Sequence, residues 1–311
     1  MVTVYTSTSQ LPTMSCCDFF HSSELMQIYE QTMRHRPYMA VATNEQGSVI
    51  AHLLAVVRNG KCRIFGEGEY VEMDAHEKER VFGDMLSAVT SKLSGKVFYI
   101  EVSDLSTKMF AYKHFRNNKY FPIHWLQVYN SLHSKAPDER VSRQLLSKIN
   151  QAKEMGVETK LVENESDFKS FYKLVRTYYN FHLRKFCPVK AFFKALNDSD
   201  NAQLFITTSH GKTIGAAAIV RTQGNSYLWF GAYLEKVYPK LLPDFMTIWN
   251  VMNREYRLSI RHFHFMDVGL PFFKNTYYDK IIQFGGRTVG AYRWFRFYPG
   301  ILNRIISIFF K

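Results

Sequence analysis

Apolar residues recur along the chain at two spacings, which predict strands and helices in a regular order. Short runs rich in Val, Ile and aromatic residues, bounded by turn pairs such as Asn59-Gly60, predict strands. Longer stretches with apolar residues every three or four positions behind a Ser or Asp predict helices. The expected strands are 39–43, 49–58, 61–66, 97–102, 125–129, 157–162, 204–209, 213–220, 227–232, 262–268 and 288–297. The expected helices are 22–33, 74–93, 107–116, 138–155, 165–179, 189–196, 241–257 and 275–283.

The same order of elements occurs in both halves of the chain, namely a helix, three strands, a helix, a strand, a helix and a strand. Landmarks Phe65, Glu101, Phe115 and Trp125 correspond to Phe230, Asp267, Phe284 and Trp294, at offsets of 165, 166, 169 and 169 residues. This near-constant offset predicts an α/β (α+β) fold of two similar units, each a mixed sheet flanked by helices. The expected limits are 1–136 and 157–311, joined by a basic helix at 137–156.

The charge and the cysteine content indicate which partners and which cellular compartment to expect. The formal net charge of +13 and the pI near 9.4 favour a polyanionic partner, such as nucleic acid, a phosphorylated substrate or an anionic membrane. The four cysteines show neither CxxC spacing nor a disulfide framework. Neither a secretory leader nor an apolar run of about 20 residues is visible, so we expect a cytoplasmic protein.

Three short stretches carry a family resemblance. They are RQLLSKINQAKEMGV at 143–157, YLWFGAY at 227–233, and FMDVG at 265–269 followed by FGGRTV at 284–289. They are similar to the basic connecting helix, the central strand, and the Asp-x-Gly strand end with its later Phe-Gly-Gly turn of the Fem family. That family contains the peptidoglycan-bridge aminoacyltransferases and their BioF2-like acetyltransferase relatives. The resemblance implies two GNAT-like units in tandem and an acyltransferase activity.

The chain departs from the Fem pattern at two points. The family usually has a lysine three residues before the Phe of the Phe-Gly turn, where this chain has Ile281, and the nearest lysine is Lys280. The second unit also lacks the long helical hairpin that some bridge-forming members use to bind charged tRNA. Both departures concern the substrate and leave the expected fold unchanged.

The loops that would hold acetyl-CoA are unusual in both halves. In this superfamily a Gly-rich loop places backbone N–H groups around the pyrophosphate at a helix N-terminus. The corresponding loop of the second half, 232–244, has no glycine and contains Pro239 and Pro243, which lack the N–H donor. In the first half, Gly66-Glu67-Gly68-Glu69 places carboxylates there. We expect no bound cofactor, and the acyl donor is either aminoacyl-tRNA, which fits this loop better, or acyl-CoA.

Asp267 is the first candidate catalytic residue, because it ends a predicted buried strand beside Gly269. It could orient an attacking amine, or equally cap the next helix or pair with a nearby cation. Tyr233 and Tyr278 could donate to an oxyanion or leaving group, although core packing is commoner for any single Tyr in so aromatic a chain. The candidate substrate-binding residues are Arg287, Arg293, Lys274, Lys280, Tyr227 and Lys236, with surface solvation as the alternative role for the cations.

Two further features bear on partners. His262 and His264 share one face of a strand, but no third ligand recurs at a recognisable spacing, so we expect no metal site. The segment 299–311 mixes apolar and basic residues at helical spacing. It predicts either a helix that touches the inner face of the membrane or a terminal helix packed on the second unit, and its many apolar residues favour membrane contact.

These observations predict a Fem-like GNAT acyltransferase whose second unit carries the site. It would transfer an acyl or aminoacyl group to an amine or hydroxyl of a phosphorylated, cell-envelope or lipid-linked acceptor, with tRNA as one source of the donor. The alternatives are an acetyl-CoA-dependent N-acetyltransferase acting on a small amine, a non-catalytic polyanion-binding protein and a nucleic-acid-binding module.

Overall fold

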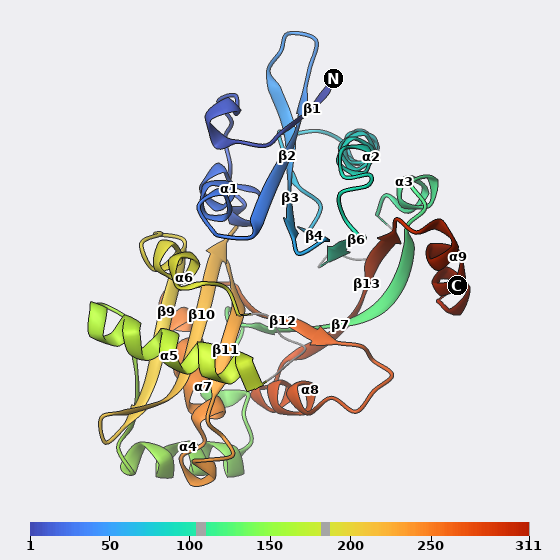
Figure 1. Cartoon of the computed structure of the whole chain (residues 1–311). Helices are drawn as coiled ribbons and strands as arrows, with labels where there is room; N and C mark the ends of the chain where they lie inside the picture. The colour runs from blue at the N-terminus through green and yellow to red at the C-terminus, as the bar shows by residue number, and fades with distance from the viewer. Residues whose placement is uncertain (104–109, 182–186, 311) are drawn as a thin grey trace. The chain divides into compact units, whose positions relative to one another are not determined.

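The computed structural model describes residues 1–103, 110–181 and 187–310. The contacts divide the chain into two compact units (Figure 1). Unit 1 comprises Met1–Leu126 together with Gly290–Lys311, and unit 2 comprises Gln127–Val289. Each unit contains a mixed sheet with flanking helices, which confirms the expected fold class.

Unit 1 is built on a sheet with the strand order β1-β2-β3-β4-β6-β13. Neighbours from β1 to β4 are antiparallel, and β4 and β6 run parallel. The strands are β1 (Val2–Tyr5), β2 (His35–Thr43), β3 (Val49–Arg58), β4 (Lys61–Phe65), β5 (Glu69–Tyr70), β6 (Tyr99–Ser103) and the last part of β13 (Arg287–Phe297). The helices are α1 (Ser23–Glu30), α2 (Ala75–Lys92), α3 (Tyr112–Asn117) and α9 (Gly300–Phe309), with short turns η1 (Thr8–Gln10) and η2 (Phe19–His21). Residues 107–109 of the helix expected at 107–116 lie outside the described part of the chain.

The core of unit 1 lies between this sheet and α2. The Asp74 carboxylate caps α2 by accepting the Glu77 N–H at 2.8 Å, and apolar residues then follow at helical spacing. They place Phe82 and Leu86 fully inside, against the strands. Phe115 of α3 and Trp294 of β13 stack in the same core with ring centroids 4.4 Å apart. The first unit therefore completes its core with a residue from the far end of the chain.

Unit 2 has the strand order β7-β12-β11-β10-β9-β8. Helix α5 covers one face of β10 and β11, and α7 covers the other face of the sheet (Figure 1). The strands are β7 (Phe121–Ser131, from Gln127 onward), β8 (Val157–Leu161), β9 (Ala202–Ser209), β10 (Lys212–Thr222), β11 (Asn225–Tyr233) and β12 (His262–Gly269). The helices are α4 (Arg143–Glu154), α5 (Glu165–Phe181), α6 (Lys190–Asn197), α7 (Pro243–Arg257) and α8 (Thr276–Ile281), with turns η3 (Pro137–Glu139), η4 (Pro239–Leu241) and η5 (Ile282–Phe284).

The compact units differ from the limits expected at 136 and 157, because part of the last strand of each half belongs to the other unit. The end of β13 pairs antiparallel with β6, from Trp294 opposite Val102 to Phe297 opposite Tyr99. The end of β7 belongs to unit 2, where the N–H after this strand, that of Leu132, donates to the Arg261 carbonyl at 2.8 Å. The basic helix α4 packs on β8 and α7 within unit 2, and α9 follows β13 into unit 1. The bounds 1–136 and 157–311 describe the two repeated halves of the sequence, and as domain limits they stay a prediction.

We expect Trp294→Ala to lower the free energy of unfolding by about 3–5 kcal/mol, because it removes a buried ring that stacks on Phe115. Urea unfolding followed by circular dichroism measures the loss. Phe309→Ala is the matched control, since that side chain is 78% exposed and should change stability by about 0.5 kcal/mol or less. Equal effects of the two substitutions would contradict the placement of β13 in this core.

Unit 1 also buries two neighbouring histidines. His52 of β3 is 2% exposed, and burial, followed by the nearby His21, lowers the pKa of His52 to about 4. Burial lowers the pKa of His21 as well, and the ring of His21 accepts the Leu54 N–H at 3.1 Å. Both imidazoles are therefore neutral in the folded protein at pH values where the unfolded chain already binds protons.

The folded protein should accordingly lose stability as the pH falls from about 6.5 to about 4, since the unfolded state binds more protons over this range. His52→Leu should remove about 3 kcal/mol of this pH dependence. Urea midpoints measured at several pH values between 4 and 7.5 test the expectation. His76→Leu, at an exposed position of α2, is the control. An unchanged slope in His52→Leu would refute the assignment.

Candidate functional site

The candidate site of unit 2 begins where β11 and β12 stop pairing. The two strands run parallel from the pair Asn225–His262 to the pair Leu228–Phe265, but β11 continues to Tyr233 and β12 to Gly269. The pairing of β11 with β10 shifts register by one residue at this point, which leaves Trp229 as a bulge. A bulge bends and twists its strand. The C-terminal halves of β11 and β12 therefore diverge and leave backbone groups facing an opening in the sheet.

Unit 1 shows no such opening between the corresponding described strands. Its parallel strands β4 and β6 pair along their full length, from Lys61–Tyr99 to Phe65–Ser103. The next residue prolongs the contact, since the Gly66 N–H donates to the Ser103 carbonyl at 2.7 Å. A substrate group cannot enter between strands that remain hydrogen-bonded to their ends, so unit 2 is the better candidate.

Asp267 lies on the β12 side of the opening, in the left-handed backbone region with φ of 56°. Asp tolerates this conformation better than most residues, because its short side chain can hydrogen-bond locally. The turn beyond it is held by Asn275, whose amide donates to the Val268 carbonyl and whose oxygen caps α8 by accepting the Tyr277 N–H at 3.1 Å. Gly269 is required here, since a Cβ would lie 2.8 Å from the Asn275 amide nitrogen. The Asp267 side chain is exposed on this rigid strand end.

Tyr233 lies on the β11 side and folds back over Gly231. A Cβ at Gly231 would lie 2.3 Å from the Tyr233 Oη, so only glycine leaves room for this ring. Tyr233 is 7% exposed, and its hydroxyl has no hydrogen-bond partner among the residues that the structure describes. Burial, and then neighbours such as Tyr277 and Tyr178, raise the pKa of Tyr233 well above its usual value. Its hydroxyl therefore stays protonated and is able to donate a hydrogen bond.

Other tyrosines join the two strand ends. Tyr179 of α5 lies beside the end of β11, with its ring centroid 6.3 Å from that of Phe230. Burial raises the pKa of Tyr179 and of Tyr277, and the charge of Asp267 raises both further. Asp267 therefore lies close to both phenols. Tyr178 and Tyr233 also contact each other, with ring centroids 6.4 Å apart. Several neutral phenols therefore lie near one carboxylate at these strand ends.

The N-terminus of α7, where the family resemblance implies a CoA pyrophosphate, is occupied by charged side chains of the protein itself. Pro243 supplies no N–H, and the carboxylate of Asp244 is buried in the first turn. The Lys280 ammonium lies 2.8 Å from Asp244 and 2.6 Å from Glu235. Burial lowers the pKa of Lys280, but these two carboxylates raise it by more, so it is above its usual value. A pyrophosphate would meet two carboxylates here, so these residues do not fit a bound CoA.

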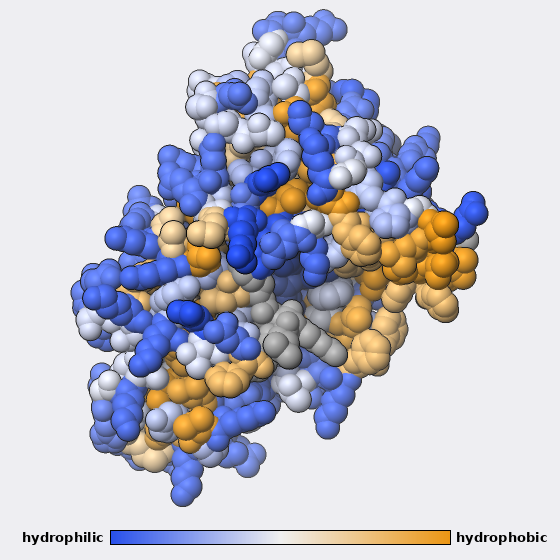
Figure 2. Space-filling view, in the orientation of Figure 1, coloured by the Kyte–Doolittle hydropathy of each residue, from blue (hydrophilic) through white to orange (hydrophobic). Residues whose placement is uncertain are grey.

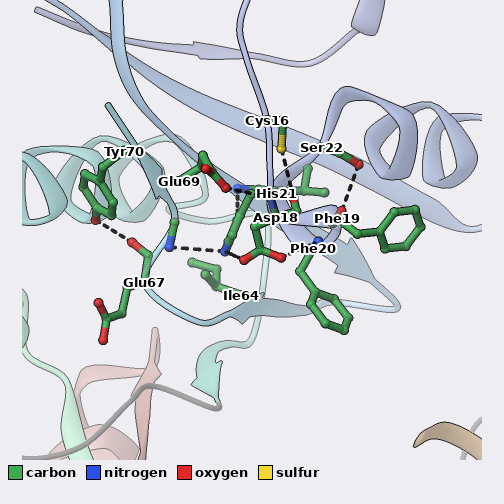
Figure 3. Close-up of polar contacts among 12 residues, drawn as sticks. Cys16, Asp18, Phe19, Phe20, His21, Ser22, Ile64, Glu67, Glu69 and Tyr70 are labelled. Carbon is green, nitrogen blue, oxygen red and sulfur yellow. Dashed lines mark hydrogen bonds and ion pairs between the residues drawn. The ribbon is translucent and has the colours of Figure 1, made fainter. Parts of the chain in front are cut away.

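The corresponding turn of unit 1 is also acidic (Figure 3). Glu69 accepts the Asp18 N–H at 2.8 Å, and Glu67 pairs with Lys78 at 2.8 Å. The Gly68 N–H points at the His21 ring, at 3.2 Å. These groups hold the N-terminal segment on the sheet, and they give an anion no site at this turn.

The structure brings together some of the residues predicted from sequence. Asp267 and Tyr233 both lie near Tyr277. Tyr278, in the first turn of α8, has its hydroxyl 3.0 Å from Thr288 Oγ1. Lys280, a predicted substrate-binding residue, forms ion pairs with Asp244 and Glu235. Arg293 lies in unit 1, where it pairs with Glu101 at 2.8 Å and its guanidinium covers the Trp125 ring at 4.0 Å.

The remaining candidates lie apart from the tyrosine cluster or on the surface. Tyr227 stacks on His264 at 4.7 Å within the paired half of β11 and β12, away from the opening. Lys236, Lys274 and Arg287 are exposed, so their substrate-binding role stays a prediction. Sequence reasoning missed Tyr178, Tyr179 and Asn275. The only signal for the first pair was its position at the end of an amphipathic helix.

We expect Gly231→Ala to destabilise unit 2 by about 1–3 kcal/mol, because the new methyl group would overlap the Tyr233 ring. In a Tyr233→Ala background the same change should cost much less, and the double-mutant cycle measures this coupling by urea unfolding. Gly290→Ala is the control, since nothing lies within 4 Å of its Cβ position. The same loss in both backgrounds would show that Tyr233 does not cover Gly231.

Comparison with known proteins agrees with this geometry. Residues 139–275 match the acetyltransferase (GNAT) domain family. No curated protein sequence matches the chain. Among solved structures, FemX is similar with a TM-score of 0.64 and 10% identity, covering 93% of this chain and 94% of that one. The L-PGS of Bacillus licheniformis gives 0.63 and 11%, covering 93% and 91%. A tandem GNAT protein of clavulanic acid biosynthesis gives 0.55 and 9%, covering 88% and 87%. Residues 139–275 thus match a GNAT acetyltransferase domain, and the chain shares its fold with FemX and with a tandem GNAT protein.

Proposed function

We propose that this protein is an acyltransferase whose unit 2 transfers an aminoacyl group to an amine or hydroxyl of a cell-envelope or lipid-linked acceptor. The observation that carries the proposal is the divergence of β11 and β12, with Asp267 at the end of β12. The end of β11 carries the buried Tyr233 hydroxyl, which has no partner among the described residues. An acyl group inserted there would meet a neutral donor on one side and a carboxylate on the other.

The two residues suit the two charges that develop during acyl transfer. The acceptor nitrogen or oxygen attacks the acyl carbon, and the Tyr233 hydroxyl donates to the carbonyl oxygen as negative charge forms on it. Asp267 orients the nucleophile and takes its proton. The bond from the acyl carbon to the donor's oxygen then breaks, and the leaving oxygen receives one proton. Proximity and a polarised carbonyl supply the catalysis, without a covalent enzyme intermediate.

The choice of donor rests on the charges at α7. Asp244 and Glu235 surround Lys280 where a CoA pyrophosphate would need free N–H donors and cations. A donor that presents no pyrophosphate at this place, such as the 3′ end of an aminoacyl-tRNA, avoids that conflict. The likeness to FemX and to the L-PGS of Bacillus licheniformis supports an acceptor in the cell envelope. The net charge of +13 suits a polyanionic donor and an anionic acceptor. The protein would then act in the cytoplasm or at the inner face of the membrane.

The GNAT family match favours one second candidate, an acetyl-CoA-dependent N-acetyltransferase that acts on a small amine. In that case exposed side chains such as Lys236 and Lys240 would have to hold the pyrophosphate in place of the missing glycine loop. Direct comparison of the two donors separates the two candidates.

Purified protein should bind a mixed pool of aminoacylated tRNA and show little affinity for acetyl-CoA, as measured by filter binding and calorimetry. Deacylated tRNA is the control for binding that depends on charge alone, which falls steeply with salt. Saturable acetyl-CoA binding with acetylation of a small amine would overturn the aminoacyl proposal. Equal binding of charged and deacylated tRNA without turnover would support a polyanion-binding protein instead.

Asp267→Asn and Tyr233→Phe should each lower the rate of acyl transfer about a hundredfold or more, with donor binding little changed. Tyr233→Phe should leave stability unchanged or slightly raised, because the lost hydroxyl has no partner among the described residues. Tyr227→Phe, in the paired half of the strands, is the matched control and should retain activity. Full activity in both site variants would show that the opening is not the catalytic site.

A further inference from the structure

Helix α9 carries apolar residues on two sides. The inner side packs on unit 1, where Phe310 stacks on Phe121 with ring centroids 6.4 Å apart. Asn303 fixes the helix, since its oxygen accepts the Phe297 N–H at 2.8 Å and its amide donates to the Lys119 carbonyl at 3.0 Å. These contacts hold α9 on unit 1 and involve only one face of the helix.

The outer side of α9 is an apolar stripe exposed to solvent. Ile301, Ile305, Ile308 and Phe309 follow one another at helical spacing and are 81%, 49%, 60% and 78% exposed. Figure 2 shows hydrophobic side chains gathered over α9. Single exposed apolar residues are ordinary, but four on one stripe of a short helix mark an interaction surface.

The surroundings of this stripe are positively charged. Arg304 lies on α9 itself, and Lys113 and Arg116 of α3 and Lys119 just beyond it are exposed. Lys119 is the residue that Asn303 contacts, and Arg296 donates to the neighbouring Asn118 carbonyl at 2.6 Å, so the end of α3 lies beside α9. The segments 92–98, 110–126 and 290–311 contain no Asp or Glu, whereas α2, which packs on α3, carries Glu77, Glu79 and Asp84. An anionic partner would meet no acidic side chain from these segments.

We propose that α9 and the basic residues of α3 form a surface that binds anionic lipid bilayers, with the outer stripe inserted among the headgroups. An amphipathic helix binds a bilayer through its buried apolar area and through cations that attract anionic lipid. None of the helices among the described residues is both long and apolar enough to cross a membrane. The contact is therefore peripheral, and it would hold the proposed enzyme at a lipid-linked acceptor.

Flotation of the full-length protein with vesicles tests the proposal. The protein should float with phosphatidylcholine vesicles that contain phosphatidylglycerol and much less with phosphatidylcholine alone. Ile305→Glu/Ile308→Glu should lower the partition coefficient roughly tenfold or more, and Lys113→Glu/Arg116→Glu about fivefold per cation replaced. Met33→Glu is the matched control, because Met33 is also exposed in unit 1, at 69%, but lies outside the stripe. Thermal unfolding should show that all variants remain folded, since each changes an exposed position.

Insertion has its own signature. Ile308→Trp should add tryptophan fluorescence that shifts to shorter wavelength on anionic vesicles, whereas Met33→Trp should add fluorescence that does not shift. Equal flotation of wild type and Ile305→Glu/Ile308→Glu would overturn the proposal. Concentration-dependent self-association that these substitutions abolish, without vesicle binding, would overturn it in favour of a second copy of the chain. Neither result requires turnover, so the proposed acyl transfer would stand or fall separately.

Discussion

The site in unit 2 depends on two neighbouring strands that stop pairing halfway along their length. Parallel strands normally satisfy each other's N–H and C=O groups to their ends, as β4 and β6 do in unit 1. In unit 2 the bulge at Trp229 turns β11 away from β12 directly after the last pair, Leu228 and Phe265. The backbone of β11 beyond this point no longer pairs with β12, and Tyr179 of α5 lies beside Gly231 there. The opening, its tyrosines and the exposed Asp267 all follow from this single break in the ladder.

Close packing around the opening determines what it can hold. Gly215 of β10 lets the start of α7 approach the sheet, since a Cβ there would lie 2.3 Å from Thr247 Oγ1. The helix N-terminus would ordinarily attract an anion. In this protein the carboxylate of Asp244 occupies the first turn of α7. Lys280 pairs with both Asp244 and Glu235, which completes a local ion-pair network. The start of α7 therefore presents carboxylates where a pyrophosphate would need hydrogen-bond donors and cations.

The two units have taken different roles from one architecture. Unit 1 keeps its parallel strands paired and uses its acidic turn to hold the N-terminal segment through Glu69. Its core is completed by Trp294, which reaches it because β13 pairs with β6. The same strand delivers α9 to unit 1, where the helix exposes one apolar side near basic residues. Under the two proposals made above, unit 2 would carry the substrate chemistry and unit 1 would attach the protein to a membrane surface.

The sequence by itself determined the local features. The order of strands and helices, the repeat, the strand end at Asp267 and Gly269, the proline-containing loop without glycine and the amphipathic C-terminal segment are all written in short-range patterns of apolar, turn and charged residues. Tertiary structure alone decided which distant residues meet. The bulge at Trp229 depends on register between strands, and Tyr179 reaches Gly231 from a helix about 50 residues earlier. Arg293 looked like a ligand-binding cation, but it meets Glu101, 192 residues away. Contacts between residues so far apart in sequence are determined by tertiary packing, and they cannot be predicted from residue spacing along the chain.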